Sequence, residues 1–363
     1  MKIAIVGTKG IPATYGGFET FAFQLAKHLS GASHEITVVN EKGNHAINFD
    51  FSVQIIFSKY EKSKNPLLFY KQSLRLVCKS HDIVLVCGVG GAAFYPLCRK
   101  NAILITNVDG LEHLRRKYTF LQRKLVFVLQ KLAAMFSDHL VADSFEVEKY
   151  WNKRFPKVIN RISSIAYGAE VPVKFNDSIL TELGIAANNY YLVVARIVPE
   201  NNLLLILEAF KLYKGRKKLI VVGNANDNQF ALSISISTDD RVRFIGSLYE
   251  KDKLDSLRVN CFAYIHGHSV GGTNPALLEA MVCKSVCLCH DNVFNREVTG
   301  SNQEYFKSAS ELVTLMEELE KDESRKLDLS NKAFNRVVEN YSWEKIAMQY
   351  EDLFSQILLN QRR

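Results

Sequence analysis

The chain has 363 residues, of which 47% are hydrophobic and 23% charged, a composition typical of a globular protein and unlike that of a disordered chain. This length exceeds what one core usually supports and predicts two domains. The net charge of +8 indicates an anionic partner, but charge alone does not distinguish a nucleic acid, a phosphorylated metabolite and an anionic membrane surface.

The start of the chain shows no signal-peptide pattern, because residues 1–6 lead directly into a strand-like run. The longest apolar stretch, residues 125–136, contains Gln130 and Lys131 and is shorter than the roughly 20 residues that a spanning helix needs. We therefore expect a cytoplasmic protein. The densest basic patch leads into this stretch and comprises Arg115, Arg116, Lys117, Arg123 and Lys124. It is either a solvated helix face or a peripheral contact with an anionic membrane surface.

Short β-rich runs alternate with helix-like segments along the chain. In the first half these runs are residues 3–6, 36–39, 53–57, 83–87, 103–106, 139–142 and 162–166. After a polar stretch the pattern resumes at residues 191–195, 219–222, 242–245, 261–265 and 286–289. Such alternation predicts an α/β protein with a parallel, doubly wound sheet in each half. Ligands of such sheets bind beyond the carboxyl ends of the strands.

The cysteines and histidines do not predict a metal site. The cysteines lie within apolar runs and are expected to be buried thiols: Cys78, Cys87, Cys98, Cys261, Cys283, Cys287 and Cys289. No second Cys or His pair has zinc-finger spacing, and His266, His268 and His290 lack a clustered acidic ligand. We therefore expect satisfied or solvent-facing histidines and no bound metal.

A glycine-rich turn follows the first predicted strand, and Gly16 and Gly17 open the first predicted helix. Backbone amides at a helix amino terminus can approach an anion closely. The turn is therefore expected to contact a phosphate or a sugar, with a simple flexible turn as the alternative. The spacing is not the dinucleotide-binding fingerprint, and the second predicted strand ends at Asn40 without the acidic residue that binds ribose in NAD proteins.

Arg196 directly follows the first predicted strand of the second half. At the carboxyl end of a strand in such a sheet, its permanently charged guanidinium would face the ligand and could hold a diphosphate through paired hydrogen bonds. A salt bridge between Arg196 and Glu200 is the alternative.

The segment HGHSVGGTNPALLEAM of the second half carries the strongest signal. Gly271 and Gly272 leave successive backbone amides to line an anion site, and Asn274 and Pro275 suit the first positions of a helix. Glu279 lies among apolar residues of that helix, where a carboxylate is rarely buried without a partner. It either pairs with a cation or accepts hydrogen bonds from ligand hydroxyls, for which ribose is suited.

The order of these features resembles that of family 4 retaining glycosyltransferases with the GT-B fold, over nearly the whole chain. The resemblance is carried by residues 16–17, 141–144, 167–170, 196, 246, 279–281 and 341–344. More narrowly, residues 107–112 (NVDGLE) and 269–275 (SVGGTNP) are similar to a bacterial subgroup that includes rhamnosyltransferases of surface-polysaccharide assembly.

The resemblance implies two Rossmann-like domains that face a central cleft. Residues 1–170 would bind the acceptor, with the helix at about 345–363 packing back on them, and residues 171–344 would bind the nucleotide sugar. It implies retaining transfer of a hexosyl group, with L-rhamnosyl favoured, to a lipid-linked saccharide. The donor would be a nucleoside-diphosphate sugar, with dTDP-rhamnose favoured. No metal or other cofactor and no nucleic acid are expected.

Two positions depart from the pattern of the broader family. That family has a glutamate eight residues before the helix glutamate and a lysine five residues after the arginine, whereas this chain has Gly271 and Asn201. The missing glutamate leaves the donor sugar open. The missing lysine places more weight on Arg196 and on the helix terminus for holding the diphosphate.

A third position, where many relatives have a histidine in the catalytic site, is Asp109 here. We expect Asp109 to position or deprotonate the acceptor hydroxyl, with Glu112 as the second candidate. The expected donor-binding residues are Gly16, Gly17, Arg196, Asn201, Gly271, Gly272, Thr273, Asn274 and Glu279. The alternatives are a GT-B-fold nucleotide-sugar epimerase and a non-catalytic nucleotide-sugar-binding protein.

Overall fold

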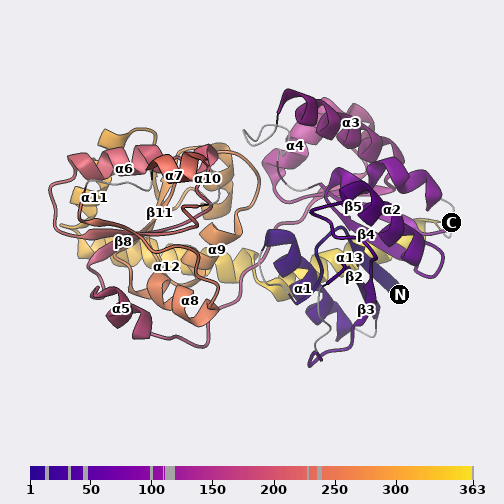
Figure 1. Cartoon of the computed structure of the whole chain (residues 1–363), viewed down its shortest axis with the longest axis horizontal. Helices are drawn as coiled ribbons and strands as arrows, with labels where there is room; N and C mark the ends of the chain where they lie inside the picture. The colour runs from indigo at the N-terminus through magenta and orange to yellow at the C-terminus, as the bar shows by residue number, and fades with distance from the viewer. Residues whose placement is uncertain are drawn as a thin grey trace. The chain divides into compact units, whose positions relative to one another are not determined.

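The computed structural model describes residues 1–12, 16–31, 34–43, 48–98, 101–108, 110, 119–226, 229–234 and 239–361. The chain divides into two compact units (Figure 1). Unit 1 consists of Met1–Tyr167 and Trp343–Arg363, and unit 2 of Gly168–Ser342. None of the described helices is long and apolar enough to cross a lipid bilayer.

Unit 1 contains, within its described residues, a seven-stranded parallel sheet in the order β3-β2-β1-β4-β5-β6-β7. Its strands are β1 (Lys2–Val6), β2 (Glu35–Asn40), β3 (Gln54–Phe57), β4 (Ile83–Cys87), β5 (Ile103–Asn107), β6 (His139–Ala142) and β7 (Ile162–Ser164). Its helices are α1 (Gly17–Ser30), α2 (Pro66–Val77), η1 (Val89–Leu97), α3 (Phe120–Phe136), α4 (Phe145–Arg154), η3 (Pro156–Val158) and α13 (Trp343–Gln361). The central strands β4 and β5 are buried along their whole length, as expected for a parallel sheet covered on both faces.

Unit 2 contains, over the part of it that the structure describes, a six-stranded parallel sheet in the order β10-β9-β8-β11-β12-β13. Its strands are β8 (Tyr190–Val194), β9 (Lys218–Val222), β10 (Val242–Phe244), β11 (Ala263–His266), β12 (Cys287–His290) and β13 (Glu304–Phe306). Its helices are α5 (Ser178–Leu183), η4 (Pro199–Asn201), α6 (Leu203–Leu212), α7 (Gln229–Ile234), α8 (Lys251–Asn260), α9 (Pro275–Val282), α10 (Val293–Thr299), α11 (Ala309–Leu319) and α12 (Glu323–Asn340). In Figure 1, α6 and α11 lie on one face of this sheet, and α8, α9 and α12 lie on the other.

The predicted fold class, two parallel-sheet α/β domains, is confirmed. Every strand-like run identified in the sequence is a strand of one of the two sheets. The structure adds the edge strand β13, whose sequence Glu-Tyr-Phe is too short to give a periodic signal.

The last helix, α13, belongs to unit 1 because it packs against the first helix, α1. The ring of Phe21 on α1 lies 6.4 Å from the ring of Trp343 and 5.4 Å from that of Tyr350, measured between centroids. Tyr350 is fully buried, and its hydroxyl accepts a hydrogen bond of 3.1 Å from the side-chain amide of Asn107 at the end of β5. The two ends of the chain therefore share one core.

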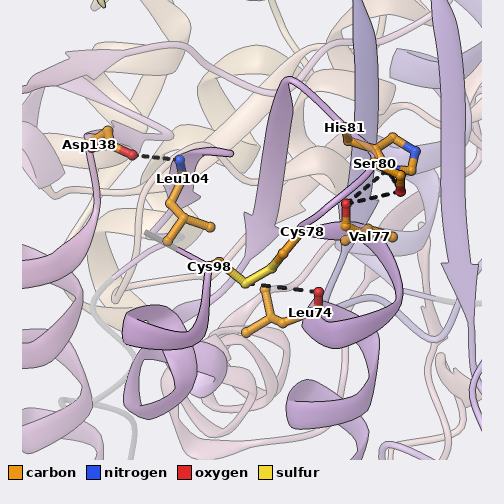
Figure 2. Close-up of a disulfide and its surroundings, with 8 residues drawn as sticks. All are labelled: Leu74, Val77, Cys78, Ser80, His81, Cys98, Leu104 and Asp138. Atoms are coloured by element: carbon orange, nitrogen blue, oxygen red, sulfur yellow. Dashed lines mark hydrogen bonds between the residues drawn. A yellow bond between two sulfur atoms is a disulfide. The ribbon is translucent and has the colours of Figure 1, made fainter. Parts of the chain in front are cut away.

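The cysteines are buried, as predicted, but the prediction that all are thiols is wrong for one pair. Cys78 and Cys98 form a disulfide with Cα atoms 5.2 Å apart (Figure 2). They follow α2 and η1, two helices that pack on one another, a proximity that sequence spacing does not reveal. The free cysteines are Cys87, Cys261, Cys283, Cys287 and Cys289. Burial raises the pKa of Cys261 and that of Cys283 to about 12, so both stay as neutral thiols at physiological pH.

Candidate functional site

The strand order of unit 2 reverses between β8 and β11, since the chain proceeds from β8 to β9 on one side and later adds β11 on the other. In open parallel sheets, ligands bind outside the carboxyl ends of the strands at such a point. The segments that follow β8 and β11 contain Arg196, Asn201 and the glycine-rich turn before α9. The topology therefore places the predicted diphosphate-binding residues at the position where this fold binds ligands.

Side-chain hydrogen bonds join these two segments. Asn202 donates to the carbonyl oxygen of Gly267 at 2.8 Å, and Asn201 donates to the carbonyl oxygen of Arg196 at 2.6 Å. The other side of the Asn201 amide, its Oδ1, lies 2.7 Å from Nδ1 of His268. A Cβ atom at Gly267 would collide with the carbonyl oxygen of Asn201, so this close approach requires glycine. Asn201 thus connects both segments rather than extending into solvent as a lysine would.

Arg196 is exposed, and its guanidinium forms no ion pair or hydrogen bond with any described residue. The salt bridge to Glu200 that the sequence left open is thus not formed. Glu200 is itself 8% exposed, and its carbonyl oxygen accepts hydrogen bonds of 2.9 Å from both the backbone N–H and the hydroxyl of Ser269. The charge of Arg196 therefore remains available to a ligand.

The turn before α9 combines buried glycines with a capped helix. Gly271 has a φ of 131°, a conformation that favours glycine, and it is buried together with Gly272. The N–H groups of both glycines have no acceptor among the described residues. Asn274 caps α9 by accepting a hydrogen bond of 3.0 Å from the N–H of Ala276, and Pro275 occupies the first position. Buried amides without a partner at the positive end of a helix favour an anionic ligand.

Thr273 is also buried in this turn, at 5% exposure, and the structure gives it a polar or electrostatic contact of its own. Gly271, Gly272 and Thr273 are thus all buried directly before α9.

Glu279 on α9 has a cationic partner, which is the first of the two roles raised by the sequence. Arg258 on α8 donates from Nη2 to Oε2 of Glu279 and from Nη1 to Asp255 at 2.8 Å. The other oxygen of Asp255 contacts the Nζ of Lys251 at 2.5 Å. Arg258 is only 2% exposed, whereas the side chain of Glu279 is 37% exposed. Burial alone would lower the pKa of Arg258, but Glu279 and Asp255 outweigh it and raise that pKa.

Arg258 was missed by the sequence reasoning. The available signal was weak, since the arginine lies three residues after Asp255 in a helix with several charged residues, where a solvated pair is the usual outcome. Arg258 is buried because α8 packs against α9, a contact that the sequence does not reveal. The ion pair fixes one oxygen of Glu279 and leaves the exposed part of the carboxylate to accept hydrogen bonds from a ligand.

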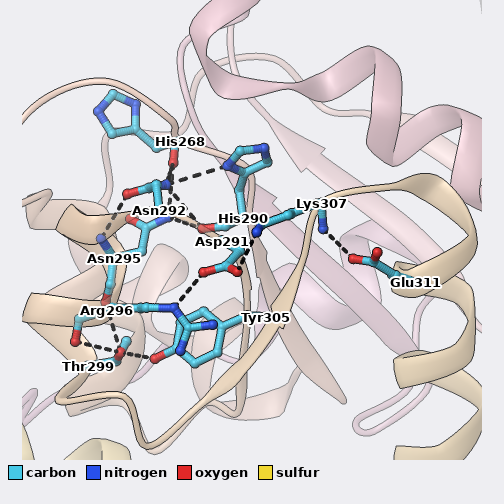
Figure 3. A network of polar contacts seen from close by, with 10 residues as sticks. All are labelled: His268, His290, Asp291, Asn292, Asn295, Arg296, Thr299, Tyr305, Lys307 and Glu311. Carbon is cyan, nitrogen blue, oxygen red and sulfur yellow. Dashed lines mark hydrogen bonds and ion pairs between the residues drawn. The ribbon is translucent and has the colours of Figure 1, made fainter.

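A network of asparagine side chains supports the carboxyl ends of β11 and β12 (Figure 3). Asn292 donates to the carbonyl oxygens of His268 at 3.0 Å and of His290 at 3.1 Å, and Asn295 donates to the same two oxygens at 2.9 Å and 2.8 Å. Beside it, Asp291 contacts the Nε of Arg296 at 2.5 Å. The bonds of Asn292 and Asn295 fix the backbone of His268, just after β11, relative to the end of β12.

The three histidines noted in the sequence lie at neighbouring strand ends. Burial lowers the pKa of His266 well below its usual range, and His268 and His290 lower it further. Burial also lowers the pKa of the half-buried His290. The described residues contain no group of three or more His, Cys, Asp or Glu side chains able to hold a metal ion.

In unit 1, the turn before α1 places a carboxylate where the sequence left a phosphate or sugar contact open. Gly16 precedes α1 with a φ of 118°, and Gly17 is its first residue. Glu19 is 8% exposed and accepts a hydrogen bond of 2.9 Å from the N–H of Lys9, while a Cβ at Gly16 would collide with the second carboxylate oxygen. The carboxylate of Glu19 repels a phosphate at this helix start, which leaves a sugar contact or a simple turn as the alternatives.

The predicted catalytic residues, Asp109 and Glu112, lie outside the described residues. The strand that leads to them is well defined, since the carbonyl oxygen of Asn107 accepts a hydrogen bond of 2.8 Å from Gly88 and the N–H of Val108 donates one of 2.9 Å to Val141. The sheet therefore places Asn107 and Val108 at the carboxyl ends of β4, β5 and β6.

Family models match the two halves of the chain separately. Residues 178–336 match the model described as Glycosyl transferases group 1, and residues 1–170 match the model described as Domain of unknown function (DUF1972). No curated protein matches the chain in sequence. The match to the glycosyl transferases group 1 domain covers most of unit 2, including Arg196, the turn before α9 and Glu279.

Solved structures share the fold over nearly the whole chain. Sucrose-phosphate synthase from Thermosynechococcus elongatus has a TM-score of 0.82 at 15% identity, covering 99% of each chain. HepE from Anabaena in complex with UDP-glucose has a TM-score of 0.74 at 13% identity, covering 98% of this chain and 100% of that one. A glycosyltransferase from Rickettsia africae has a TM-score of 0.72 at 13% identity, covering 98% of each chain.

The class of protein follows from the domain match and the fold together. Unit 2 carries a glycosyl transferases group 1 domain, and both sheets have the arrangement of GT-B glycosyltransferases. The protein is therefore a glycosyltransferase of the GT-B type. The predicted fold class and the predicted enzyme class are both confirmed at this level.

Proposed function

We propose that the protein is a retaining glycosyltransferase that transfers a hexosyl group, with L-rhamnosyl favoured, from a nucleoside-diphosphate sugar to a lipid-linked saccharide in bacterial surface-polysaccharide synthesis. One observation carries the donor part of this proposal. An exposed guanidinium, buried amides without a partner and a partly exposed carboxylate lie on the segments that end β8 and β11 or on the helix that follows.

The diphosphate of the donor would be held by Arg196, by the N–H groups of Gly271 to Thr273 and by the positive end of α9. These groups are in place before the sugar leaves, so they would stabilise the negative charge that develops on the departing nucleoside diphosphate. The donor set supplies this stabilisation without a metal ion, and we propose metal-independent transfer. Asn274 would act by capping the helix rather than by touching the ligand.

The ribose of the donor would contact Glu279. Arg258 fixes one carboxylate oxygen, and the exposed part of the group can accept hydrogen bonds from ribose hydroxyls. HepE, which shares the fold, has been solved with UDP and with UDP-glucose, which supports a nucleoside-diphosphate sugar as the ligand class. It does not identify the base or the sugar for this chain.

The acceptor would bind unit 1. Gly16 and Gly17, next to the carboxylate of Glu19, would serve the donor instead, by contacting a hydroxyl of its sugar. Asp109 would position or deprotonate the acceptor hydroxyl, with Glu112 as the second candidate. Asp109→Asn should abolish transfer while donor binding persists, and full transfer activity in that variant would remove Asp109 from the catalytic role.

A lipid-linked acceptor requires the enzyme to work at the inner surface of the cell membrane, and helix α3 supports such a contact. Phe120, Leu121 and Leu125 on α3 are 71%, 76% and 54% exposed. The side of the helix that packs on the protein is formed instead by Leu129, Gln130, Ala133 and Ala134. The helix therefore exposes several large apolar side chains, most of them in its first two turns, which an ordinary surface helix would bury.

The charge of α3 suits an anionic surface. Its sequence, FLQRKLVFVLQKLAAMF, contains no acidic residue, and Arg123, Lys124 and Lys131 are exposed beside the apolar side chains. Basic and apolar side chains on one exposed helix surface are typical of helices that lie in the membrane interface. We therefore include peripheral membrane contact through α3 in the proposal.

The donor part is tested by a thermal-shift screen of nucleoside diphosphates and their sugars, because a ligand that binds only the folded state raises Tm. Larger shifts with dTDP compounds support rhamnosyl transfer, and larger shifts with UDP or GDP compounds count against it. Incubation of the preferred donor with and without acceptor separates transfer from epimerisation, since an epimerase converts the donor alone. If no donor raises Tm and none releases a nucleoside diphosphate, the proposed transferase activity is refuted and a protein that binds another ligand remains.

A further inference from the structure

The side chain of His268 lies between the two segments that form the candidate diphosphate site. Its Nδ1 is 2.7 Å from Oδ1 of Asn201, in the segment after β8. Its Nε2 faces the turn before α9, because a Cβ built at Gly271 would lie 3.3 Å from that nitrogen. Figure 3 shows the ring directed away from the asparagine network that binds the His268 carbonyl. The backbone and one ring nitrogen are thus fixed, and the second nitrogen points to the glycine turn.

The partners of Asn201 determine where His268 carries its proton. Asn201 donates from Nδ2 to the carbonyl oxygen of Arg196, so its Oδ1 is the atom that faces the imidazole. An amide oxygen only accepts, and Nδ1 of His268 must therefore be the donor. In the neutral ring this leaves Nε2 without a hydrogen. Protonation adds the hydrogen and the positive charge at Nε2, the nitrogen next to Gly271.

The diphosphate needs more positive charge than Arg196 alone supplies, because each of its two phosphates is negatively charged. Residues 195–202 and 266–274 contain three side chains that can be positive, namely Arg196, His266 and His268. His266 is 4% exposed, and burial lowers its pKa well below the usual range, so it stays neutral. His268 is partly exposed and is the remaining side chain in these segments that can add charge.

We propose that His268 binds the diphosphate of the donor through Nε2, and that protonation of His268 strengthens this binding. The proposal rests on the donor site proposed above. Asn201 is then a positioning residue, because it holds Nδ1 and so directs Nε2 to the turn before α9. In the broader family that this chain resembles, the second positive charge comes from a lysine at the position of Asn201. Here His268 supplies that charge, and its ring is hydrogen-bonded to Asn201.

The direction of the pH dependence follows from the charge. A histidine in water gains its positive charge as the pH falls below about 6.5, so the proposal predicts tighter donor binding at pH 5.5 than at pH 8.5. The titratable and charged groups at the same strand ends are His266 on β11, His290 and Asp291 at the end of β12, and Arg196 and Glu200 after β8. Arg196 keeps its charge over this range and His266 stays neutral, so His290 is the group that must be separated experimentally.

The experiment measures the Kd of UDP-glucose and of dTDP-glucose for the full-length protein by calorimetry between pH 5.5 and 8.5. The diphosphate of a nucleotide sugar is a diester, which does not ionise in this range, whereas the terminal phosphate of a free nucleoside diphosphate does so near pH 6. We expect binding of the preferred donor to be about tenfold tighter at pH 5.5 than at pH 8.5, as one charge-assisted hydrogen bond would give.

Two substitutions separate the roles of the ring nitrogens. His268→Gln places a neutral N–H near the position of Nε2, so it should keep most of the affinity seen at pH 8.5 and lose the pH dependence. His268→Asn places its amide near Nδ1 only, and should weaken donor binding at pH 5.5 about tenfold or more. His290→Asn is the matched control at the neighbouring strand end and should leave the pH profile of the wild type unchanged. A pH dependence that persists in His268→Gln, or that disappears in His290→Asn, would overturn the proposal.

A double variant tests the charge directly. Asn201→Lys combined with His268→Asn supplies a permanent charge in the same segment, so donor affinity should recover and become independent of pH. If the double variant has the Tm of His268→Asn but its affinity for the donor is not restored, His268 does not act through its positive charge. Donor binding without any pH dependence in the wild type refutes this inference alone, whereas the absence of any nucleotide-sugar binding refutes the donor site and the inference together.

Discussion

Arg258 and Glu279 form an ion pair in which one partner is buried and the other reaches the surface. The guanidinium is 2% exposed and the glutamate side chain 37% exposed, and Nη2 of Arg258 donates to Oε2 of Glu279. Asp255, itself 3% exposed, accepts from Nη1 of the same guanidinium. The arginine therefore links the interior of unit 2 to the carboxylate proposed to bind ribose.

Removing this arginine should destabilise unit 2. Among the described residues, Arg258→Leu leaves the buried Asp255 with Lys251 as its one charged partner and removes the cation that contacts Glu279. Breaking a buried ion pair from one side costs about 3 to 5 kcal/mol, so a decrease of that order in the free energy of unfolding is expected. Chemical denaturation of the wild type and of Arg258→Leu measures it. A change below about 1 kcal/mol would mean that the pair contributes little to stability.

Changing the surface partner should instead affect the ligand. Glu279→Gln keeps the shape of the side chain but removes the charge that accepts hydrogen bonds from ribose, and should weaken nucleoside-diphosphate binding about tenfold or more. The exposed Glu323→Gln on α12 is the matched control, since the Glu323 side chain is 80% exposed and forms an ion pair of 3.2 Å with Lys326. Calorimetric titration with the preferred nucleotide gives both affinities, and equal losses in the two variants would exclude a specific ribose contact.

Arg196 should contribute to binding and not to folding. Because its guanidinium is exposed and forms no ion pair with a described residue, Arg196→Ala should leave Tm within about 1 °C of the wild type while weakening nucleotide-sugar binding about tenfold to a hundredfold. Arg196→Lys keeps the charge but cannot form paired hydrogen bonds, so its affinity for the nucleotide sugar should lie between those of the wild type and Arg196→Ala. Wild-type affinity in Arg196→Ala would refute the diphosphate role.

Helix α3 should bind anionic lipid through its outward side chains. A double substitution, Leu121→Glu with Leu125→Glu, adds negative charge to exposed positions and should reduce co-sedimentation with vesicles of phosphatidylglycerol and phosphatidylcholine by about tenfold. Leu327→Glu on α12, an apolar residue that is 62% exposed, is the matched control and should bind as the wild type does. Binding that is equally strong to neutral vesicles, or unchanged in the α3 variant, would remove this helix from membrane contact.

The fold and part of the candidate site could be predicted because each depends on local sequence. Buried parallel strands are continuous apolar runs, and a glycine turn followed by Asn274 and Pro275 defines a helix start within a few residues. Long-range partners could not be predicted in the same way. The pairing of Arg258 with Glu279, the bond between Asn201 and His268, and the disulfide of Cys78 with Cys98 each join segments far apart in the chain or of unknown orientation.

The outward apolar side chains of α3 show a different limit. The apolar stretch of residues 125–136 forms most of a helix, but an apolar stretch alone does not tell which side of that helix faces the protein. Here Ala133 and Ala134 lie inside, since the helix packs closely on η1. The small side chains at these two positions allow that close approach.

The packing of α13 on α1 has a consequence for the order in which the protein forms during synthesis. Phe21 finds Trp343 and Tyr350 only after almost the entire chain has been translated, whereas unit 2 is one continuous segment. The ends of that segment meet, since the N–H of Ala169 donates to the carbonyl oxygen of Tyr341 at 2.8 Å. Unit 2 can therefore complete its core as soon as it leaves the ribosome. The amino-terminal half is synthesised first, but its core is complete only after α13 has been added.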